Sequence, residues 1–376
     1  MPTSEFRSPG KIIFGVGALE SLGKEAMALA AHVHAARALL VTGRKAMAEA
    51  GITARCMGIL KSAGVEAALF DEVEPEPDVT TVDRCRRAAA AHGAEVVIGL
   101  GGGSAIDVAK AAAALFRSEE PTREFHRGRR IATIGLPNIA VPSTAGTGSE
   151  MTNNSVISDR ERRWKASIRD ESLVPAVALI DPQVTAGAPP FVTAVSGVDA
   201  LVQAVESYLS RYATPLTESI SLGAAEEMAR ALPAVVSRGS DMELRTRAAW
   251  GSAMAGLALT NARLGVVHGI AHPVGVRYGV PHGLVCGVLL PGALAFNCEA
   301  APEKYGRLRQ LLGSDPVDYA RRLLAECGLP ARLTQYKLRE DTFDAMAEEA
   351  LASGSTKANP RAATKEDICE LLRTIA

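Results

Sequence analysis

The feature that most constrains the fold is a change of pattern near Pro189. Up to about residue 185, short apolar runs alternate with Ala-rich stretches whose apolar positions recur three and four residues apart. The runs predicted as strands are Lys11–Phe14, Ala38–Thr42, Val65–Phe70, Glu95–Leu100 and Ile139–Val141, and the stretches predicted as helices include Ala46–Ser62 and Thr80–His92. Such alternation builds βαβ units, so this half predicts a parallel sheet with helices on both faces.

The second half is predicted to be helical. From Val192 onward, long Ala-, Leu- and Glu-rich stretches contain few β-branched runs, and glycine and proline mark the turns. The proline-containing segment Asp181–Pro190 is typical of a linker. We therefore predict an α/β domain over residues 1–185 and an all-α domain over residues 186–376, with a small-molecule site in the cleft between them.

Composition excludes several classes of protein. The chain has 41 Lys+Arg and 42 Asp+Glu, a balance that argues against a dedicated nucleic-acid binder. It has no uninterrupted apolar run of about 18 residues, which excludes a membrane-spanning helix, and its start lacks the layout of a signal peptide. The six cysteines are scattered without a CxxC pair, which favours reduced thiols. We expect a cytoplasmic protein with neither a nucleic-acid nor a membrane partner.

A glycine run follows one predicted strand. Gly101, Gly102 and Gly103 precede Ser104, where a helix-like stretch begins. Backbone without side chains can approach a phosphate closely, and a helix N-terminus presents free N–H groups to it. Ser104 can cap this helix, and Asp107 lies in its first turn, where a carboxylate is favoured. The spacing is neither GxGxxG nor a P-loop, so a plain strand-to-helix turn is the alternative to the phosphate site that we favour.

A second loop of small residues follows the predicted strand Ile139–Val141. The segment Pro142–Glu150 holds four hydroxyls within seven residues, among them Thr144 and Thr147. It could donate hydrogen bonds to a pyrophosphate or a nicotinamide amide, or it could be a polar surface turn.

Three of the seven histidines fall in one 15-residue window. His268 and His272 are spaced i,i+4, so both rings project from one face of a helix. Pro273 would end or bend this helix, and His282 follows it in the chain. They could ligate a metal, or one could ligate while another moves protons, or the cluster could be chance or structural. The remaining histidines are expected to be surface or structural residues: His32, His34, His92 and His126.

A helix-like run also places Asp199 and Gln203 at i,i+4. Asp199 has apolar neighbours, and a buried carboxylate needs a cation or metal as partner. The alternative is a residue at a helix N-terminus that interacts with the helix dipole.

The order of these motifs resembles the iron-containing (group III) alcohol dehydrogenase family. The resemblance spans nearly the whole chain and is carried by FGVG at 14–17, GGGSAIDVAK, PSTAGTGSE, IDP at 180–182, GVDAL, HGIAHPVG…PHG and NPR at 359–361. It implies a Rossmann-like α/β domain for a dinucleotide and a helical domain, together in a dehydroquinate synthase-like architecture. It also implies a homodimer.

The resemblance further implies hydride transfer between NAD(P) and a small alcohol, aldehyde or ketone, with a divalent metal such as Fe²⁺ or Zn²⁺ on the substrate oxygen. Such an ion lowers the pKa of a bound hydroxyl, and the nicotinamide carries the hydride. By motif position, the catalytic residue near the nicotinamide is His272, and the metal ligands are Asp199, Gln203, His268 and His282. The cofactor-binding residues are Gly101, Gly102, Gly103, Ser104, Asp107, Thr144 and Thr147.

Two departures from the family pattern matter. Residue 203 is Gln where the family has His, and an amide oxygen is a weaker ligand for Fe²⁺ or Zn²⁺. We therefore expect weaker metal binding, a different metal or none.

Relatives that prefer NAD carry Asp at the position of Gly43, whereas here Arg44 and Lys45 follow a glycine, so we expect NADP(H) to be accepted.

Other functions stay open at this point. A maleylacetate reductase-like enzyme would reduce a keto acid without a metal, and glycerol dehydrogenases and dehydroquinate synthase-type lyases share the architecture. A catalytically decayed nucleotide-binding protein is the alternative of another class. Retention of Asp199, His268, His272 and His282 argues against decay.

Overall fold

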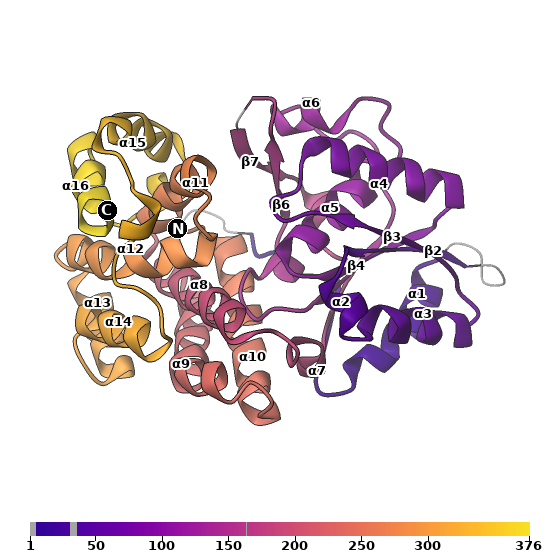
Figure 1. Cartoon of the computed structure of the whole chain (residues 1–376), viewed down its shortest axis with the longest axis horizontal. Helices are drawn as coiled ribbons and strands as arrows, with labels where there is room; N and C mark the ends of the chain where they lie inside the picture. Colours follow the sequence, from indigo (N-terminus) through magenta and orange to yellow (C-terminus); the bar gives the residue numbers. More distant parts are fainter. Residues whose placement is uncertain (1–4, 31–35, 163) are drawn as a thin grey trace. The chain divides into compact units, whose positions relative to one another are not determined.

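The computed structural model describes residues 5–30, 36–162 and 164–376 of the chain (Figure 1). It contains two compact units. Of the described residues, one unit comprises Arg7–Thr144 and Ser149–Gly187, and the other comprises Glu5–Phe6, Ala145–Gly148 and Ala188–Ala376. Each unit has its own hydrophobic core, the first on two faces of a sheet and the second among helices.

The first unit is built on a six-stranded sheet in which every pairing is parallel. In spatial order the strands are β1 (Lys11–Phe14), β8 (Val177–Ile180), β5 (Asn138–Pro142), β4 (Val96–Gly101), β2 (Arg37–Gly43) and β3 (Glu66–Val73). All five predicted strands are present. The sequence did not predict β8, which pairs with both β1 and β5.

Helices cover both faces of this sheet, and the alternation of side chains along β2 shows why. Leu39 and Val41 belong to the core beneath α4 (Val79–His92) and α5 (Gly103–Ala114). Ala38 and Leu40 belong to the opposite core, with α1 (Leu22–Leu29) and α3 (Ile52–Ser62). Strand side chains alternate between faces, so one apolar run supplies both cores. The shorter helices here are α2 (Ala46–Glu49), α6 (Thr122–His126), α7 (Pro182–Thr185), η1 (Ala18–Ser21), η2 (Ser149–Met151) and η3 (Glu171–Leu173).

Two local features of this unit differ from the sequence prediction. The single helix predicted over Ala46–Ser62 is wrong, because the chain breaks at Gly51, which takes the left-handed φ of 73° and begins α3. An antiparallel hairpin, β6 (Asn154–Asp159) and β7 (Trp164–Arg169), was not predicted. It is anchored on α5, because Ser155 Oγ donates to the Asp107 carbonyl at 2.8 Å.

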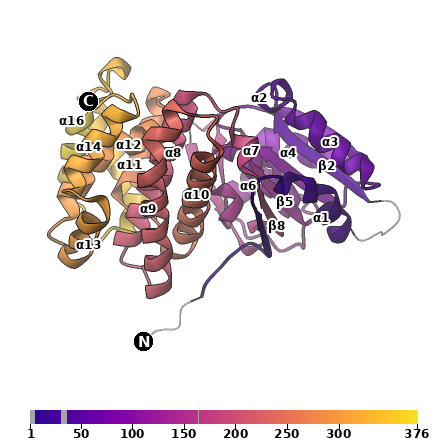
Figure 2. The same ribbon diagram turned by 90° about the horizontal axis from the view of Figure 1, so that it is seen from below.

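The second unit is helical throughout its described elements. Its helices are α8 (Pro190–Leu209), α9 (Pro215–Ser237), α10 (Met242–Ala262), α11 (Val266–Tyr278), α12 (His282–Asn297), α13 (Pro302–Leu312), α14 (Pro316–Glu326), α15 (Phe343–Ala352) and α16 (Lys365–Ile375), with η4 (Thr334–Tyr336), η5 (Glu340–Thr342) and η6 (Thr356–Ala358). Helices α8, α9 and α10 lie side by side (Figure 2). With a parallel sheet in one unit and helices in the other, the predicted fold class is confirmed.

Pro273 lies inside α11 and does not end it. We expected Pro273 to end or bend the helix; an end there is wrong, because α11 continues through it to Tyr278, and the bend stays a prediction. Proline removes one helix hydrogen bond, and burial of the surrounding turns in the helical core offsets that loss.

Within the described part of the chain, no helix combines the length and apolar character that crossing a bilayer requires.

Candidate functional site

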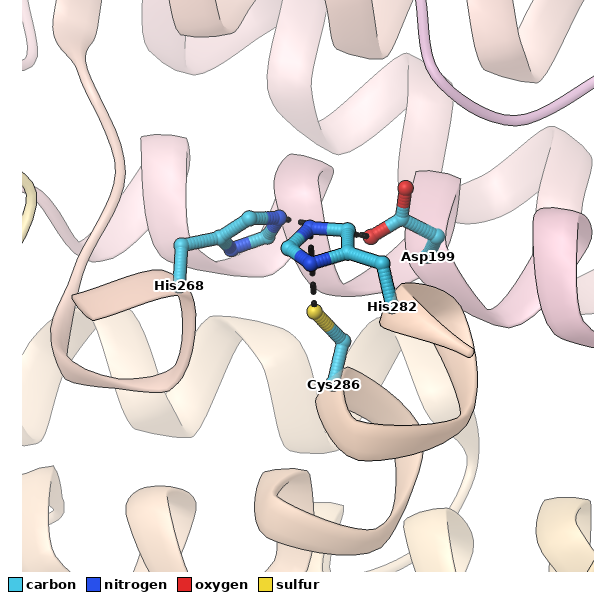
Figure 3. A group of neighbouring side chains, drawn as sticks. All are labelled: Asp199, His268, His282 and Cys286. Atoms are coloured by element: carbon cyan, nitrogen blue, oxygen red, sulfur yellow. Dashed lines mark hydrogen bonds and ion pairs between the residues drawn. The ribbon is translucent and has the colours of Figure 1, made fainter. Parts of the chain in front are cut away.

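Four ligand-type side chains from three helices gather in the helical unit (Figure 3). Asp199 comes from α8, His268 from α11, and His282 and Cys286 from the first turns of α12. One donor atom of each lies within 4.8 Å of the others. His268 Nε2 and Asp199 Oδ1 are 3.3 Å apart, His282 Nε2 and Asp199 Oδ1 are 3.9 Å apart, and Cys286 Sγ and His282 Nε2 are 3.6 Å apart.

These spacings suit the corners of one tetrahedral metal site. With metal–nitrogen and metal–oxygen bonds near 2.1 Å and a metal–sulfur bond near 2.3 Å, the tetrahedral edges are about 3.4 Å and about 3.6 Å. The donor types also suit a divalent transition metal, because imidazole, carboxylate and thiolate are the ligands that Zn²⁺ uses in proteins.

Burial supports the same interpretation. Asp199 and His268 are only 4% and 3% exposed, and Asp199 Oδ1 and His268 Nε2 have no hydrogen-bond partner. Buried polar atoms are normally satisfied. The 3.3 Å between these two atoms is ion-pair distance when the imidazole is protonated, and a bound cation would satisfy both atoms when the imidazole is neutral. Burial opposes ionisation of Asp199, but the neighbouring imidazoles of His282 and His268 hold its pKa below the usual range. His282 is the partly exposed member, with 27% of its side chain accessible.

Gln203 lies one turn after Asp199 on α8 and is itself buried. Its Nε2 donates to Asp199 Oδ2 at 3.0 Å. This bond holds the Asp199 carboxylate with its other oxygen, Oδ1, toward the two histidines. The Gln203 Oε1 atom is buried without a hydrogen-bond partner.

Sequence reasoning missed Glu206, which lies on the same face of α8. Its carboxylate accepts from His268 Nδ1 at 2.6 Å and from the Val267 backbone N–H at 2.7 Å. A carboxylate on the far nitrogen of a ligating imidazole fixes its tautomer and leaves Nε2 free to bind metal. A signal existed, because the i,i+4,i+7 spacing from Asp199 through Gln203 places Glu206 on one helix face.

Asn359, part of the NPR motif, supports the start of α11. Its Oδ1 accepts from the Val266 N–H at 3.2 Å, and its Nδ2 donates to Asn297 Oδ1 at 2.7 Å. A Cβ on Gly265 would lie only 2.6 Å from Glu206 Oε1, so a larger residue there would displace the side chains that meet the helix N-terminus. This packing sets the position of His268.

The structure brings the predicted histidine trio together. The His272 and His282 ring centroids are 5.2 Å apart, and those of His268 and His282 are 5.4 Å apart. The sequence analysis also missed Cys286, although its i,i+4 spacing from His282 was visible. Of the other histidines, His126 Nε2 pairs with the Ile157 carbonyl at 2.9 Å and His92 Nε2 with the Glu66 carbonyl at 3.1 Å. The remaining two lie outside the described residues: His32 and His34.

A second candidate site lies wholly in the α/β unit. It is a pocket of about 950 Å³ that is lined by the last residues of β2, β3 and β4, by residues that follow them, and by the start of α5. The predicted residues that line it are Gly43, Gly101, Gly102 and Ser104. Gly101 has φ 147°, and a Cβ there would lie 2.9 Å from the Ala105 Cβ, so only glycine fits this turn.

The other predicted cofactor-binding residues do not line the pocket. Gly103 is the first residue of α5, and Thr144 lies beside Gly102, with Oγ1 3.7 Å from the position of a Cβ there. Thr147 is exposed and belongs to the helical unit. Asp107 is buried in the α/β unit.

Asp107 and Lys110 form a buried network under the hairpin. Asp107 accepts from Ser149 Oγ and from the Val156 N–H. Lys110 is 0% exposed and donates to the carbonyls of Ser149 at 2.8 Å and Asn154 at 2.6 Å. Burial lowers the pKa of Lys110 to about 8, although Asp107 opposes this shift. The polar end of the GGGSAIDVAK motif therefore holds the 149–156 segment on α5.

Charge is unevenly partnered around the pocket. Arg84 pairs with Glu72 at 3.2 Å, and Arg160 pairs with Glu74 at 3.6 Å. In the described ranges, no carboxylate lies within ion-pair distance of Arg44 or Lys45, which also line the pocket. These two cations are available to an anionic ligand.

Known proteins resemble this chain along its whole length. Residues 9–182 match the family model for iron-containing alcohol dehydrogenase, and residues 193–376 match the model for the C-terminal part of the Fe-containing alcohol dehydrogenase family. Sulfoacetaldehyde reductase of Bilophila wadsworthia (strain 3_1_6) is 33% identical over 377 residues, which cover 96% of each chain.

Solved structures also resemble this chain over its whole length. The crystal structure of a 1,3-propanediol oxidoreductase is similar with a TM-score of 0.95 and 32% identity, covering 100% of both chains. Sulfoacetaldehyde reductase from Bifidobacterium kashiwanohense, in complex with NAD⁺, is similar with a TM-score of 0.91 and 29% identity, covering 100% of this chain and 99% of that one.

Proposed function

Because the chain belongs to the iron-containing alcohol dehydrogenase family, as its motifs predicted, we propose that it transfers a hydride between a nicotinamide coenzyme and a small aldehyde or alcohol. In this proposal residues 1–185 hold the coenzyme, and residues 186–376 hold the metal and the substrate. The observation that carries it is the group of Asp199, His268 and His282, in which the buried atoms Asp199 Oδ1 and His268 Nε2 lack hydrogen-bond partners and suit a cation.

The residues of the helical unit have separate tasks. Asp199, His268 and His282 would hold a divalent metal, which lowers the pKa of an alcohol hydroxyl when it is bound. Glu206 keeps the His268 proton on Nδ1 and so presents Nε2 as a donor. We assign His272 the catalytic movement of a proton to or from the substrate oxygen, because its ring lies beside His282 and is partly accessible.

The pocket of the α/β unit is the proposed coenzyme site. The turn at Gly101 and Gly102 and the N-terminus of α5, which begins at Gly103, suit a pyrophosphate, since close backbone and unpaired N–H groups meet there. Ser104 lines the same edge. Further contacts are proposed for Thr144 and Thr147, whereas the buried Asp107 would act by holding α5 and the hairpin in place.

We further propose that NADP(H) is accepted. Gly43, the last residue of β2, lines the pocket and has no carboxylate of its own to repel a 2′-phosphate, and Arg44 and Lys45 follow it. Two cations without carboxylate partners at that position can pair with the phosphate's negative charge.

Coenzyme oxidation with a substrate panel tests the proposal. Purified enzyme loaded with Zn²⁺ or Fe²⁺ is mixed with NADPH or NADH and with short aldehydes, including sulfoacetaldehyde, which two of its relatives are named for. We expect turnover that a chelator abolishes and added metal restores. Tight coenzyme binding without turnover on any aldehyde, alcohol or keto acid would refute the proposal and favour a decayed nucleotide-binding protein. Metal-independent reduction of a keto acid would favour a maleylacetate reductase-like enzyme.

We also propose a cytoplasmic homodimer. All six cysteines are free, which suits a reducing compartment. The homodimer follows from family resemblance, and light scattering on the purified chain tests it.

A further inference from the structure

We propose that the thiolate of Cys286 is the fourth protein ligand of the metal centre, in place of Gln203, and that the centre therefore selects Zn²⁺. This inference rests on the proposed function, because it refines the metal site on which that function depends. The sequence led us to expect weaker metal binding, a different metal or none, because residue 203 is Gln. This proposal names the ligand and the metal that we infer instead.

The first argument is geometric. Cys286 is fully buried, and its Sγ lies 3.6 Å from His282 Nε2. That separation matches the nitrogen–sulfur edge of about 3.6 Å calculated for a tetrahedral zinc site. Spacing of i,i+4 on α12 places both side chains on one helix face, and Figure 3 shows them converging with Asp199 and His268.

The second argument is independent of the cysteine. Asp199 Oδ1 and His268 Nε2 are deeply buried and lack hydrogen-bond partners, and both belong to the four-atom group that includes Cys286 Sγ. Throughout residues 5–30, 36–162 and 164–376, no other group of His, Cys, Asp and Glu side chains has metal-site spacing. A cation at this position would satisfy both atoms, and the imidazole of His282 and the thiol of Cys286 are the other two ligand atoms of the group.

The third argument concerns Gln203. Its Nε2 donates to Asp199 Oδ2, so the amide already serves to orient a ligand carboxylate. Amide oxygens are poor ligands for borderline metals such as Zn²⁺, whereas a thiolate is among the best. The chain therefore combines a weak donor at residue 203 with a strong donor at residue 286.

The donor set also disfavours the harder divalent metals. One carboxylate, two imidazoles and one thiolate favour Zn²⁺ over the harder Mn²⁺ and Mg²⁺, which prefer oxygen ligands. Zinc can expand to five-coordinate, so four protein ligands still allow a substrate oxygen to bind.

Spectroscopy of the full-length enzyme tests this assignment without relying on activity. In the Co²⁺-loaded wild type we expect the strong near-ultraviolet charge-transfer band of a thiolate–cobalt bond. Cys286→Ser should abolish the band and weaken Zn²⁺ binding at least tenfold, whereas Gln203→Ala should keep the band. The matched control is Cys327→Ser, which removes a buried thiol at the end of α14 and should leave both measurements unchanged.

A measurement on the wild type covers the case in which Cys286→Ser does not fold. X-ray absorption at the zinc edge should show one sulfur at about 2.3 Å. A shell of only nitrogen and oxygen, a charge-transfer band that survives in Cys286→Ser, or failure to bind either metal would overturn the ligand assignment.

Different results would overturn the proposed function and the assignment of Cys286 as a metal ligand. A sulfur ligand in an enzyme that turns over no aldehyde, alcohol or keto acid would overturn the proposed function and support the ligand assignment. Metal-dependent aldehyde reduction with no sulfur at the metal would overturn the ligand assignment alone.

Discussion

Replacing Glu206 by Gln should weaken metal binding without touching any ligand. Glu206 is 5% exposed, and its Oε2 accepts from His268 Nδ1 at 2.6 Å. The amide of Gln can still accept from the Val267 N–H through its oxygen, but its NH₂ group then faces His268 Nδ1. The imidazole would satisfy that group by moving its proton to Nε2, the atom that faces Asp199 Oδ1.

The magnitude follows from this tautomer change. To bind metal through Nε2, His268 must return its proton to Nδ1, where two donors then oppose each other. A buried donor left without an acceptor costs about 1–3 kcal/mol. At about 1.4 kcal/mol per factor of ten, metal affinity should fall by about 5- to 150-fold, a range that includes the 10- to 100-fold typical of such supporting residues.

Competition between the enzyme and a chelator of known affinity measures this loss. Glu226→Gln on α9 is the control, because it removes a carboxylate paired with Arg230 in the same unit. Glu206→Gln should also regain most of its kcat at saturating metal, since the ligands remain. If folded Glu206→Gln binds Zn²⁺ as tightly as the wild type, the assigned role of Glu206 is wrong.

Three further predictions concern the α/β unit. Gly43→Asp should shift kcat/KM from NADPH toward NADH at least tenfold because a carboxylate repels the 2′-phosphate; Gly43→Asn, which meets the same Val73 carbonyl 3.3 Å away, should shift it far less. Lys110→Met should destabilise this unit by about 3–5 kcal/mol in urea unfolding because it leaves buried acceptors without their cation, whereas the same change at the exposed Lys61 should cost little. Burial raises the pKa of Glu150 to about 7, so the folded state binds its proton more tightly. Stability should therefore fall as the pH rises from about 4.5 to 7, and Glu150→Gln should remove that part of the slope in melts across this range.

The strands show how far local pattern predicts this fold. Five runs predicted β1 to β5. Burial on both faces of a parallel sheet requires continuous apolar residues in the central strands β2, β4 and β5, whereas the edge strands β1 and β3 are partly exposed. Strand β8 was missed, although Val177–Ile180 is an apolar run as long as the predicted β1, because Asp181 and Pro182 follow it at once and no predicted helix separates it from a further strand. The hairpin was missed because Asn154–Asp159 has only two apolar residues and no polar–apolar alternation, and its side chains alternate in burial only in the structure.

Asp107 shows where the local sequence pattern was insufficient to predict the surroundings of a side chain. Asp107 was expected near the coenzyme from its place in the motif. Its neighbours in space, Ser149 and Val156, are more than forty residues away along the chain, and they place its carboxylate in a buried network. No spacing rule reports a partner at that separation.

The sequence by itself determined the two-part division into α/β and helical halves, the glycine turn before α5, and the pairing of His268 with His272 on one helix face. These properties depend on periodicity and backbone freedom over a few residues, and such effects act locally. Only the tertiary structure decided which side chains meet around Asp199. The packing of α8, α11 and α12 brought Cys286 within ligand distance and set Glu206 behind His268, because donor atoms from separate helices converge only when their cores are packed.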